Sequence, residues 1–397
     1  MKDVDIKKLI KKETKRQNRV INLIASENYV SKDVLRALGS VFVNKYAEGY
    51  PGRRYYGGNG NIDELEELCQ ERALKLFGLH HRHPMSKRKS TSDVEWHVNV
   101  QPYSGSPANL AVYIALIPYG EKIMGMSLES GGHLTHSQKV SITGKLWKQI
   151  PYDVDKETEM INYEKLLQIA KKEKPKMIIA GTTAYSRKID FKKFRKIADA
   201  AGAYLMVDMS HIAGLVATGV HPSPFPYADV VTTTTHKTLR GPRAALIFCK
   251  QELSSEIDKA VFPGLQGGPH MNQVAAMAVA LKEAIQPGFK KYIKQVVKNA
   301  KVLAEELKKR GWRIVSNGTD THLFLVDVWQ RGIGGKEASE RLEKAGIIVN
   351  KNTIPFDTRK PFNPSGIRIG TPAVTTMGMK EKDMIKIAEK IDRILKN

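Results

Sequence analysis

DVVTTTTHKTLRGPRAAL, residues 229–246, is the stretch from which the fold of this chain can be predicted. Its residues Val230–Thr235 are all β-branched, which is typical of a strand. Gly241-Pro242 signals a turn, and the apolar run Ala244–Cys249 follows so closely that we expect a second strand antiparallel to the first. Lys237 stands at the end of the first strand. A lysine in that place must reach water, pair with a carboxylate or react.

Strands and helices alternate on the N-terminal side of this stretch. The predicted strands are Lys122–Met126, Met177–Ala180 and Ala203–Val207, and the predicted helices are Tyr163–Lys174 and Phe191–Ala200. Strands that alternate with helices of this length are typical of an α/β fold with a mostly parallel sheet.

A smaller α/β unit is predicted at the C-terminal end. It follows two helical stretches, Gln273–Ile285 and Phe289–Arg310. Its predicted strands are Arg313–Val315, His322–Val328, Ile347–Val349 and Ile367–Ile369, and its predicted helices are Lys336–Lys344 and Lys380–Leu395. At the other end of the chain, Ile6–Arg19 is predicted to be a polar helix. We therefore expect an N-terminal arm over residues 1–50, a large domain over 51–280 and a small domain over 281–397.

Composition excludes several classes of protein. The chain has 397 residues, of which 41% are hydrophobic, so a large core is expected. Two cysteines cannot form a disulfide framework and fit a reducing compartment. The N-terminus has no apolar signal segment, and no apolar run approaches the ~20 residues that a membrane span needs. These features predict a cytoplasmic protein without a membrane contact.

The formal net charge of +23 suggests a polyanionic partner such as nucleic acid. The lysines are spread along most helices rather than gathered in one block, which favours a solvated basic surface over a nucleic-acid site. His80, His81 and His83 begin a basic segment that runs to Glu95. These histidines lack the spacing of metal ligands, so we predict a surface loop there and no metal site.

Three polar features follow predicted strands. The Ser104-Gly105-Ser106 turn precedes a helix, with Ser106 expected at the N-cap and Pro107 as the first helical residue. Free N–H groups at such a helix start bind phosphate. Asp208 and Lys237 each follow another strand, and ligands of α/β sheets collect at the carboxyl ends of strands. A phosphate cradle, a carboxylate and a lysine suit pyridoxal phosphate (PLP), with His236, Arg240 and Arg243 as nearby cations.

Each of these residues also has a structural interpretation. Asp208 is compatible with a buried helix cap, and Lys237 with a surface lysine beyond an edge strand. His133 and His211 are compatible with hydrogen-bonded core histidines. The combination favours the cofactor site. A phosphate-binding P-loop is excluded, because the glycine-rich run that would precede the lysine is absent.

The chain resembles serine hydroxymethyltransferases, which are PLP enzymes of the aspartate aminotransferase fold type. The resemblance covers nearly the whole chain, from IASEN at Ile24 to GIRIGTPA at Gly366. Between them lie, in order, KYAEGYPGRRYYGG, NVQPYSGSPAN, GGHLTH, VDMSHIAGLVA, VVTTTTHKTLRGPR, QGGP and VNKN. The first of these belongs to a long loop, Val43–Asn61, that is rich in tyrosine and glycine, and such loops are usually functional.

The resemblance implies a set of cofactor-binding residues. Lys237 would form the Schiff base, Asp208 would pair with the pyridine nitrogen, and His133 would stack on the cofactor ring. The other cofactor contacts would be Tyr46, Ser104, Gly105, Ser106, Thr183, His211, Thr234, His236, Arg243 and Gly268. Tyr46 and Gly268 would come from the partner subunit of an obligate homo-oligomer.

The resemblance also implies substrate-binding residues. Arg368 would clamp the carboxylate of serine or glycine, and Glu48 would be the acid/base group of the one-carbon transfer. The other substrate contacts would be Ser26, Tyr55, Tyr56, Leu128, Gly132, Leu134, Asn352 and Phe362. Of these, Tyr55, Leu128, Leu134, Asn352 and Phe362 would line a tetrahydrofolate site.

The implied activity is the reversible interconversion of serine and glycine, with tetrahydrofolate as acceptor of the one-carbon unit. The alternative within the same fold type is a folate-independent aldolase of β-hydroxy amino acids. A third alternative is a non-enzymatic RNA-binding protein that uses the positive charge. Glu48 and its flanking tyrosines favour the folate-dependent transferase.

Overall fold

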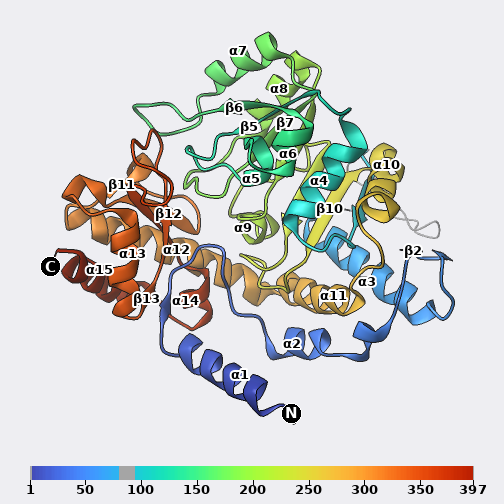
Figure 1. The fold of residues 1–397 in the computed structure, drawn as a ribbon, viewed down its shortest axis with the longest axis horizontal. Coiled ribbons are helices and arrows are strands. Elements are labelled where there is room, and N and C mark those ends of the chain that lie inside the picture. Colours follow the sequence, from blue (N-terminus) through green and yellow to red (C-terminus); the bar gives the residue numbers. More distant parts are fainter. Residues whose placement is uncertain (1, 80–93, 397) are drawn as a thin grey trace.

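The structure is a computed structural model that describes residues 2–79 and 94–396, and its centre is a seven-stranded sheet (Figure 1). The strand order is β4-β10-β9-β8-β7-β5-β6. β9, β8, β7, β5 and β6 pair in parallel, whereas β10 is antiparallel to both of its neighbours. The strands are β4 (Trp96–Asn99), β5 (Lys122–Met126), β6 (Lys148–Tyr152), β7 (Met177–Gly181), β8 (Tyr204–Asp208), β9 (Val230–Thr234) and β10 (Ala245–Lys250). The mostly parallel α/β sheet and the antiparallel turn after β9 confirm the predicted fold class.

The central strands are buried on both faces, which explains why they consist mostly of apolar and β-branched residues. Successive side chains of a strand point to opposite faces. In β9, Val231 packs in one core and Val230 in another. In β8, Leu205 and Val207 belong to the first core, and Met206 belongs to the second. Both faces of the sheet are therefore covered by helices.

The first face is covered by helices α3, α7, α8, α9 and α11, and the second mainly by α4 and α10. The helices of this part of the chain are α3 (Gly60–Leu76), α4 (Gly105–Leu116), α5 (Leu134–Ser137), α6 (Ile142–Leu146), α7 (Tyr163–Glu173), α8 (Phe191–Ala201), α9 (Ala213–Ala217), α10 (Ser254–Lys259) and α11 (Met271–Ile285). Two N-terminal helices, α1 (Val4–Gln17) and α2 (Lys32–Leu38), lie along the lower edge in Figure 1.

The C-terminal unit contains a four-stranded antiparallel sheet in the order β11-β12-β15-β14. Its core is formed with helices α12, α13 and α15. The elements are β11 (Arg313–Ile314), β12 (Leu323–Asp327), β14 (Asn350–Asn352), β15 (Gly366–Gly370), α12 (Pro287–Lys309), α13 (Gly335–Lys344), α14 (Pro372–Thr376) and α15 (Glu381–Lys396). Figure 1 shows this unit, in orange and red, beside the larger sheet.

The N-terminal arm is tied to the C-terminal unit. The predicted strand at Ile347–Val349 forms as β13 (Ile347–Ile348), but it pairs in parallel with β1 (Ile21–Asn22) of the arm. Leu23 continues from β1 into the C-terminal core. Helix α12 connects the two larger units, because its residue Ile293 packs in the core of the large sheet and its residue Leu307 in the C-terminal core. The division of the chain near residue 280 stays a prediction.

Some short strands were not predicted from the sequence. β6 contains a proline and lies at an edge of the sheet, where a missing N–H is tolerated. β14 has the polar sequence NKN, and the two-residue strands β2 (Gly49–Tyr50) and β3 (Arg53–Arg54) lie inside the predicted long loop. Among the described residues, no helix is long and apolar enough to cross a membrane.

The predicted N-cap of helix α4 was wrong. The helix begins at Gly105, with Ser104 at the N-cap, and Ser106 lies in its first turn. Gly105 allows this earlier start, because a side-chain carbon there would lie 2.7 Å from Thr234 Cγ2 of β9. Pro107 is tolerated inside the first turn, since the N–H that it lacks would have no intrahelical acceptor.

We predict that Gly370→Ala weakens the attachment of the arm. Gly370 N donates to Leu23 O at 2.8 Å, and an added methyl group would overlap the Ala25 backbone. Overpacking of this kind costs about 1–3 kcal/mol of unfolding free energy, which urea denaturation would measure. Gly288→Ala is the control, because nothing lies within 4 Å of the added carbon. Equal stability of the two variants would contradict the prediction.

Candidate active site

A cavity of about 140 Å³ lies at the carboxyl ends of the central strands. The structure brings together here the three predicted features, the Ser104–Ser106 turn, Asp208 and Lys237. The complete lining is Ser104, Gly105, Ser106, Asn109, His133, His136, Thr182, Thr183, Asp208, Ser210, His211, Thr234, His236, Lys237 and Arg243. Nine positions of this lining besides Lys237 and Asp208 were predicted as cofactor contacts, namely Ser104, Gly105, Ser106, His133, Thr183, His211, Thr234, His236 and Arg243.

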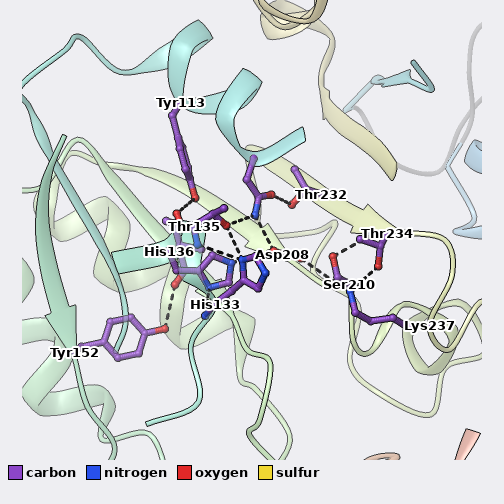
Figure 2. Close-up of polar contacts among 12 residues, drawn as sticks. Tyr113, His133, Thr135, His136, Tyr152, Asp208, Ser210, Thr232, Thr234 and Lys237 are labelled. Atoms are coloured by element: carbon purple, nitrogen blue, oxygen red, sulfur yellow. Dashed lines mark hydrogen bonds and ion pairs between the residues drawn. The ribbon is translucent and has the colours of Figure 1, made fainter. Parts of the chain in front are cut away.

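Asp208 is held at the end of β8 by a dense set of donors (Figure 2). His136 Nε2 and Asn109 Nδ2 both lie 2.9 Å from its Oδ2, and the Ser210 N–H donates to its Oδ1 at 3.0 Å. Burial alone would raise the pKa of Asp208, but the hydrogen bond from His136 and the other donors outweigh it and hold the pKa well below the usual range. The carboxylate therefore stays ionised and can face a cationic partner.

Lys237 follows β9 and points back to it, since its Nζ donates to Thr234 Oγ1 at 3.0 Å (Figure 2). Burial lowers its pKa to about 8, with Arg368 and Arg243 acting in the same direction and Asp208 in the opposite one. The backbone of Lys237 is fixed as well, because Asn28 Nδ2 donates to its carbonyl at 2.9 Å. A fixed amine with this pKa is neutral in a substantial fraction of molecules near neutral pH and is ready to react with a carbonyl group.

Two histidines of the cavity, His133 and His236, are neutral. Burial lowers the pKa of His133 to about 4 and that of His236 to about 3. His133 Nδ1 accepts from the Thr135 N–H at 3.2 Å, so its proton is on Nε2. A neutral ring of this kind can lie flat against an aromatic ligand without the cost of a buried charge.

Arg368 of β15 carries a buried charge. Its Nη1 donates to Thr183 O at 2.8 Å, and its Nε donates to Asn350 Oδ1 at 3.1 Å. The residue is 6% exposed, and among the described residues no carboxylate pairs with it. Burial lowers its pKa to about 10, which leaves the guanidinium charged. A buried, charged guanidinium without a carboxylate partner is well suited to bind an anionic ligand.

A second group of predicted residues does not line this cavity. Glu48, Tyr46, Tyr55 and Tyr56 lie on the tyrosine-rich loop, where the tyrosines are 55%, 81% and 44% exposed. Tyr46 Oη donates to Glu48 Oε1 at 3.3 Å, and its ring lies against Gly268 of the same chain. The single chain therefore keeps this group apart from Lys237.

The backbone on either side of Glu48 is clamped by a buried arginine. Arg54 Nη1 donates to the carbonyls of Ala47 at 3.0 Å and Gly49 at 2.7 Å. The guanidinium is balanced by Glu66 at 2.6 Å, whose side chain is fully buried, and by Asp63 at 2.8 Å. The loop is thus fixed at its base although Tyr46, Tyr55 and Tyr56 are exposed.

The remaining predicted substrate residues lie outside the lining of the cavity. Leu134 is 47% exposed and Phe362 is 84% exposed. Gly132 packs directly against the end of β5, which leaves no room there for a side chain. Ser26, Leu128 and Asn352 also lie outside the lining.

Several polar residues of the site were not predicted from the sequence. Asn109 lies one helical turn beyond the SGS turn, and His136 is the last residue of GGHLTH, so both stood within the quoted motifs. Their role was not evident, because Asp208 is 99 positions from Asn109 and 72 from His136. The predicted surface histidines His80, His81 and His83 lie outside the described residues. Within residues 2–79 and 94–396, no cluster of three or more histidine, cysteine, aspartate or glutamate side chains could hold a metal.

Phosphate-bearing cofactors bind at this edge of an α/β sheet, and a reactive lysine opposite an ionised carboxylate is the arrangement used by PLP-dependent enzymes. A family model described as serine hydroxymethyltransferase matches residues 1–391. The chain therefore belongs to the serine hydroxymethyltransferase family. It is a PLP-dependent transferase that acts on serine and glycine.

We predict that capture of the cofactor aldehyde by the cofactor-free chain depends on pH with a midpoint near 8. Only the neutral amine reacts, and the lowered pKa of Lys237 of about 8 means that the neutral fraction grows as pH rises and levels off above that value. The gain of visible absorbance after mixing with PLP would measure the rate. Lys237→Ala should show no such gain. A rate that climbs until about pH 10.4, as for an ordinary lysine, would contradict the lowered pKa.

Proposed function

We propose that this protein transfers the hydroxymethyl carbon of serine to tetrahydrofolate, which gives glycine and 5,10-methylenetetrahydrofolate, and that it also catalyses the reverse reaction. The observation that carries the proposal is the clamped loop that presents Glu48 among exposed tyrosines, in addition to a cavity suited to PLP. A folate-independent aldolase would need the cavity alone.

The residues of the cavity fit PLP. Asp208 would pair with the pyridine nitrogen, Lys237 would form the Schiff base, and His133 would stack on the ring. The free N–H groups at the start of α4 would hold the phosphate. When it is bound, PLP acts as the sink for the electron pair that remains at the α-carbon of the amino acid when a bond to that carbon breaks.

The amino-acid substrate would be held by its carboxylate. Arg368 keeps two contacts with the protein, through Nε and Nη1, and its guanidinium has further N–H groups for a carboxylate oxygen. Ser26 and Tyr56 would add contacts to the same substrate. Fixing the carboxylate at one end sets which bond of the α-carbon faces the cofactor.

Glu48 would exchange a proton with the hydroxyl oxygen of serine as the one-carbon unit leaves. Tyr46, whose hydroxyl donates to Glu48, would orient that carboxylate. Tyr55, Leu128, Leu134, Asn352 and Phe362 would hold the pterin of tetrahydrofolate, and the exposure of Tyr55, Leu134 and Phe362 leaves room for a large flat ligand.

A complete site would need a second copy of the chain. Glu48 and Gly268 do not line the cavity of their own chain, whereas all the residues proposed to hold the pyridine ring do. We therefore propose a homodimer in which each copy supplies Glu48, Tyr46 and Gly268 to the cavity of its partner. The two cysteines, Cys69 and Cys249, are buried and unpaired, which supports a reducing compartment such as the cytoplasm.

We predict that tetrahydrofolate stimulates serine cleavage at least about tenfold, and that Glu48→Gln removes most of this stimulation. A positioned acid/base group contributes about 10²–10⁴ in rate. The same variant should retain cleavage of bulky 3-hydroxy amino acids to within about threefold, because those substrates do not need the folate step. Glycine formation with and without tetrahydrofolate is the measurement. No effect of tetrahydrofolate on the unmodified enzyme would favour the aldolase.

We predict that Lys237→Ala and Glu48→Gln subunits, when mixed, recover tetrahydrofolate-dependent serine cleavage that neither variant shows alone. For tetrahydrofolate-dependent serine cleavage, Lys237→Ala and Glu48→Gln each disable both sites of a homodimer. Half of the randomly mixed dimers are hybrids, and each hybrid has one intact site, so about a quarter of the native activity should return. Subunits are mixed after dissociation in mild denaturant, and each variant treated alone is the control. If each site were built from one chain, the mixture would stay inactive.

A further inference from the structure

Two buried histidines meet at the wall of the cavity. His211 lies three residues beyond β8 and lines the cavity, and His322 lies directly before β12. His211 Nδ1 is 3.3 Å from His322 Nε2, and the ring planes differ by 25°. Both residues are fixed through their backbones, since His211 O accepts from Thr238 Oγ1 at 3.1 Å and His322 O accepts from the Thr371 N–H at 3.1 Å. The short contact between ring nitrogens requires that one of them donates and the other accepts.

Both rings are neutral, so a single proton lies between them. His322 is completely buried and His211 is 5% exposed. Burial, together with the nearby charges of Lys237 and Arg368, lowers the pKa of both histidines, that of His322 to about 3. The pair therefore has two possible arrangements. Either both rings carry their proton on Nε2, or both carry it on Nδ1.

The second nitrogen of His322 distinguishes the two arrangements. His322 Nδ1 is buried and has no hydrogen-bond partner among the described residues. If His211 donated to His322, this Nδ1 would be a buried N–H without an acceptor. If His322 donates, it is only an unused lone pair. Buried N–H groups without an acceptor are rarer in proteins than unused acceptors. The first arrangement, with His322 as the donor, is therefore favoured.

We propose that His322 is a positioning residue that fixes His211 with its proton on Nε2, so that His211 offers a hydrogen-bond donor to the cavity. Once His211 Nδ1 accepts from His322, only Nε2 can carry the proton of the neutral ring. The ligand for this donor is an oxygen that bears negative charge, on the cofactor or on the carboxylate of the amino acid. The identity of that ligand depends on the proposed function, but the position of the proton does not.

The consequence of the opposite arrangement shows why the position of the proton matters. A bare Nε2 would present a lone pair to a negatively charged oxygen and would repel it, which would weaken binding of the amino acid or the cofactor. His322 reaches the site only through His211, so it acts without touching the ligand.

The position of the proton can be measured directly. We would record ¹⁵N spectra of the full-length protein labelled at histidine, both with PLP and after its removal, because protonated and bare ring nitrogens have different shifts. His221 is an internal reference for the opposite arrangement, because its Nε2 accepts from the Ile189 N–H at 3.2 Å and its Nδ1 faces Pro222 O at 3.0 Å. His211→Gln would identify the signals of His211. We expect a proton on Nε2 in His211 and on Nδ1 in His221.

Two variants test the role of His322. In His322→Leu the donor is lost, so we expect the His211 signals to shift toward a mixture of both arrangements and KM for serine to rise about tenfold, with a smaller change in kcat. In His322→Gln the side-chain amide can still donate, so the native signals and KM should be largely retained. His221→Gln is the matched control for removal of a buried histidine away from the cavity, and it should leave the signals of His211 unchanged.

The results separate this inference from the proposed function. A proton on Nδ1 of His211 in the unmodified protein would overturn the inference, and so would an unchanged His211 signal in His322→Leu. If His322→Leu fails to fold, the spectra of the unmodified protein and of His322→Gln still show whether His211 carries its proton on Nε2. If tetrahydrofolate has no effect on serine cleavage while His211 carries its proton on Nε2, the folate assignment fails and the inference stands.

Discussion

The buried charge of Arg368 is the constraint around which the site is arranged. A guanidinium that is 6% exposed and has no carboxylate partner among the described residues is costly, so its N–H groups must be satisfied by neutral acceptors. Asn350 on the neighbouring strand and the Thr183 carbonyl meet this need. Thr183 is in turn fixed by its N–H bond to Gly131 O. Burial is the main cause of the lowered pKa of Lys237, and the charge of Arg368 acts in the same direction.

The cavity and the loop that carries Glu48 are therefore held in place by different contacts. The cavity is rigid because its polar side chains hold one another, as Asn109 does when it donates to both Thr135 and Asp208. The loop that carries Glu48 is held at its base, where Arg54 and Glu66 form a buried ion pair. Such a pair contributes little net stability but is expensive to break, which makes it effective in fixing one loop conformation. Exposed tyrosines on a fixed loop can then be presented to another surface.

Much of the fold and part of the site could be predicted from the sequence. Strands buried on both faces are recognisable because β9 consists of β-branched residues and β8 has the apolar run Leu205–Val207 before Asp208. The edge strand β6 and the polar β14 carry no such signal. Asp208 and Lys237 were identified because strand ends face ligands in α/β sheets. The contacts that hold the site residues in place were not predicted. The hydrogen bond between His211 and His322, for example, joins positions 111 residues apart that no local sequence pattern connects. The start of α4 was misplaced because the close approach of Gly105 to Thr234 is visible only in three dimensions.

Helix α12 has a consequence for how the chain folds. It has 23 residues and is therefore about 34 Å long. Its first half packs in the core of the large sheet and its second half in the C-terminal core. Neither core is complete without it, and the N-terminal arm closes the C-terminal core through Leu23. A chain that is still emerging from the ribosome can complete neither core until α12 has been made, and its first residues wait for the last strands. The core of the large sheet can therefore form once α12 is available, whereas the C-terminal core also needs residues up to Leu395, so the N-terminal arm is among the last segments to find its place.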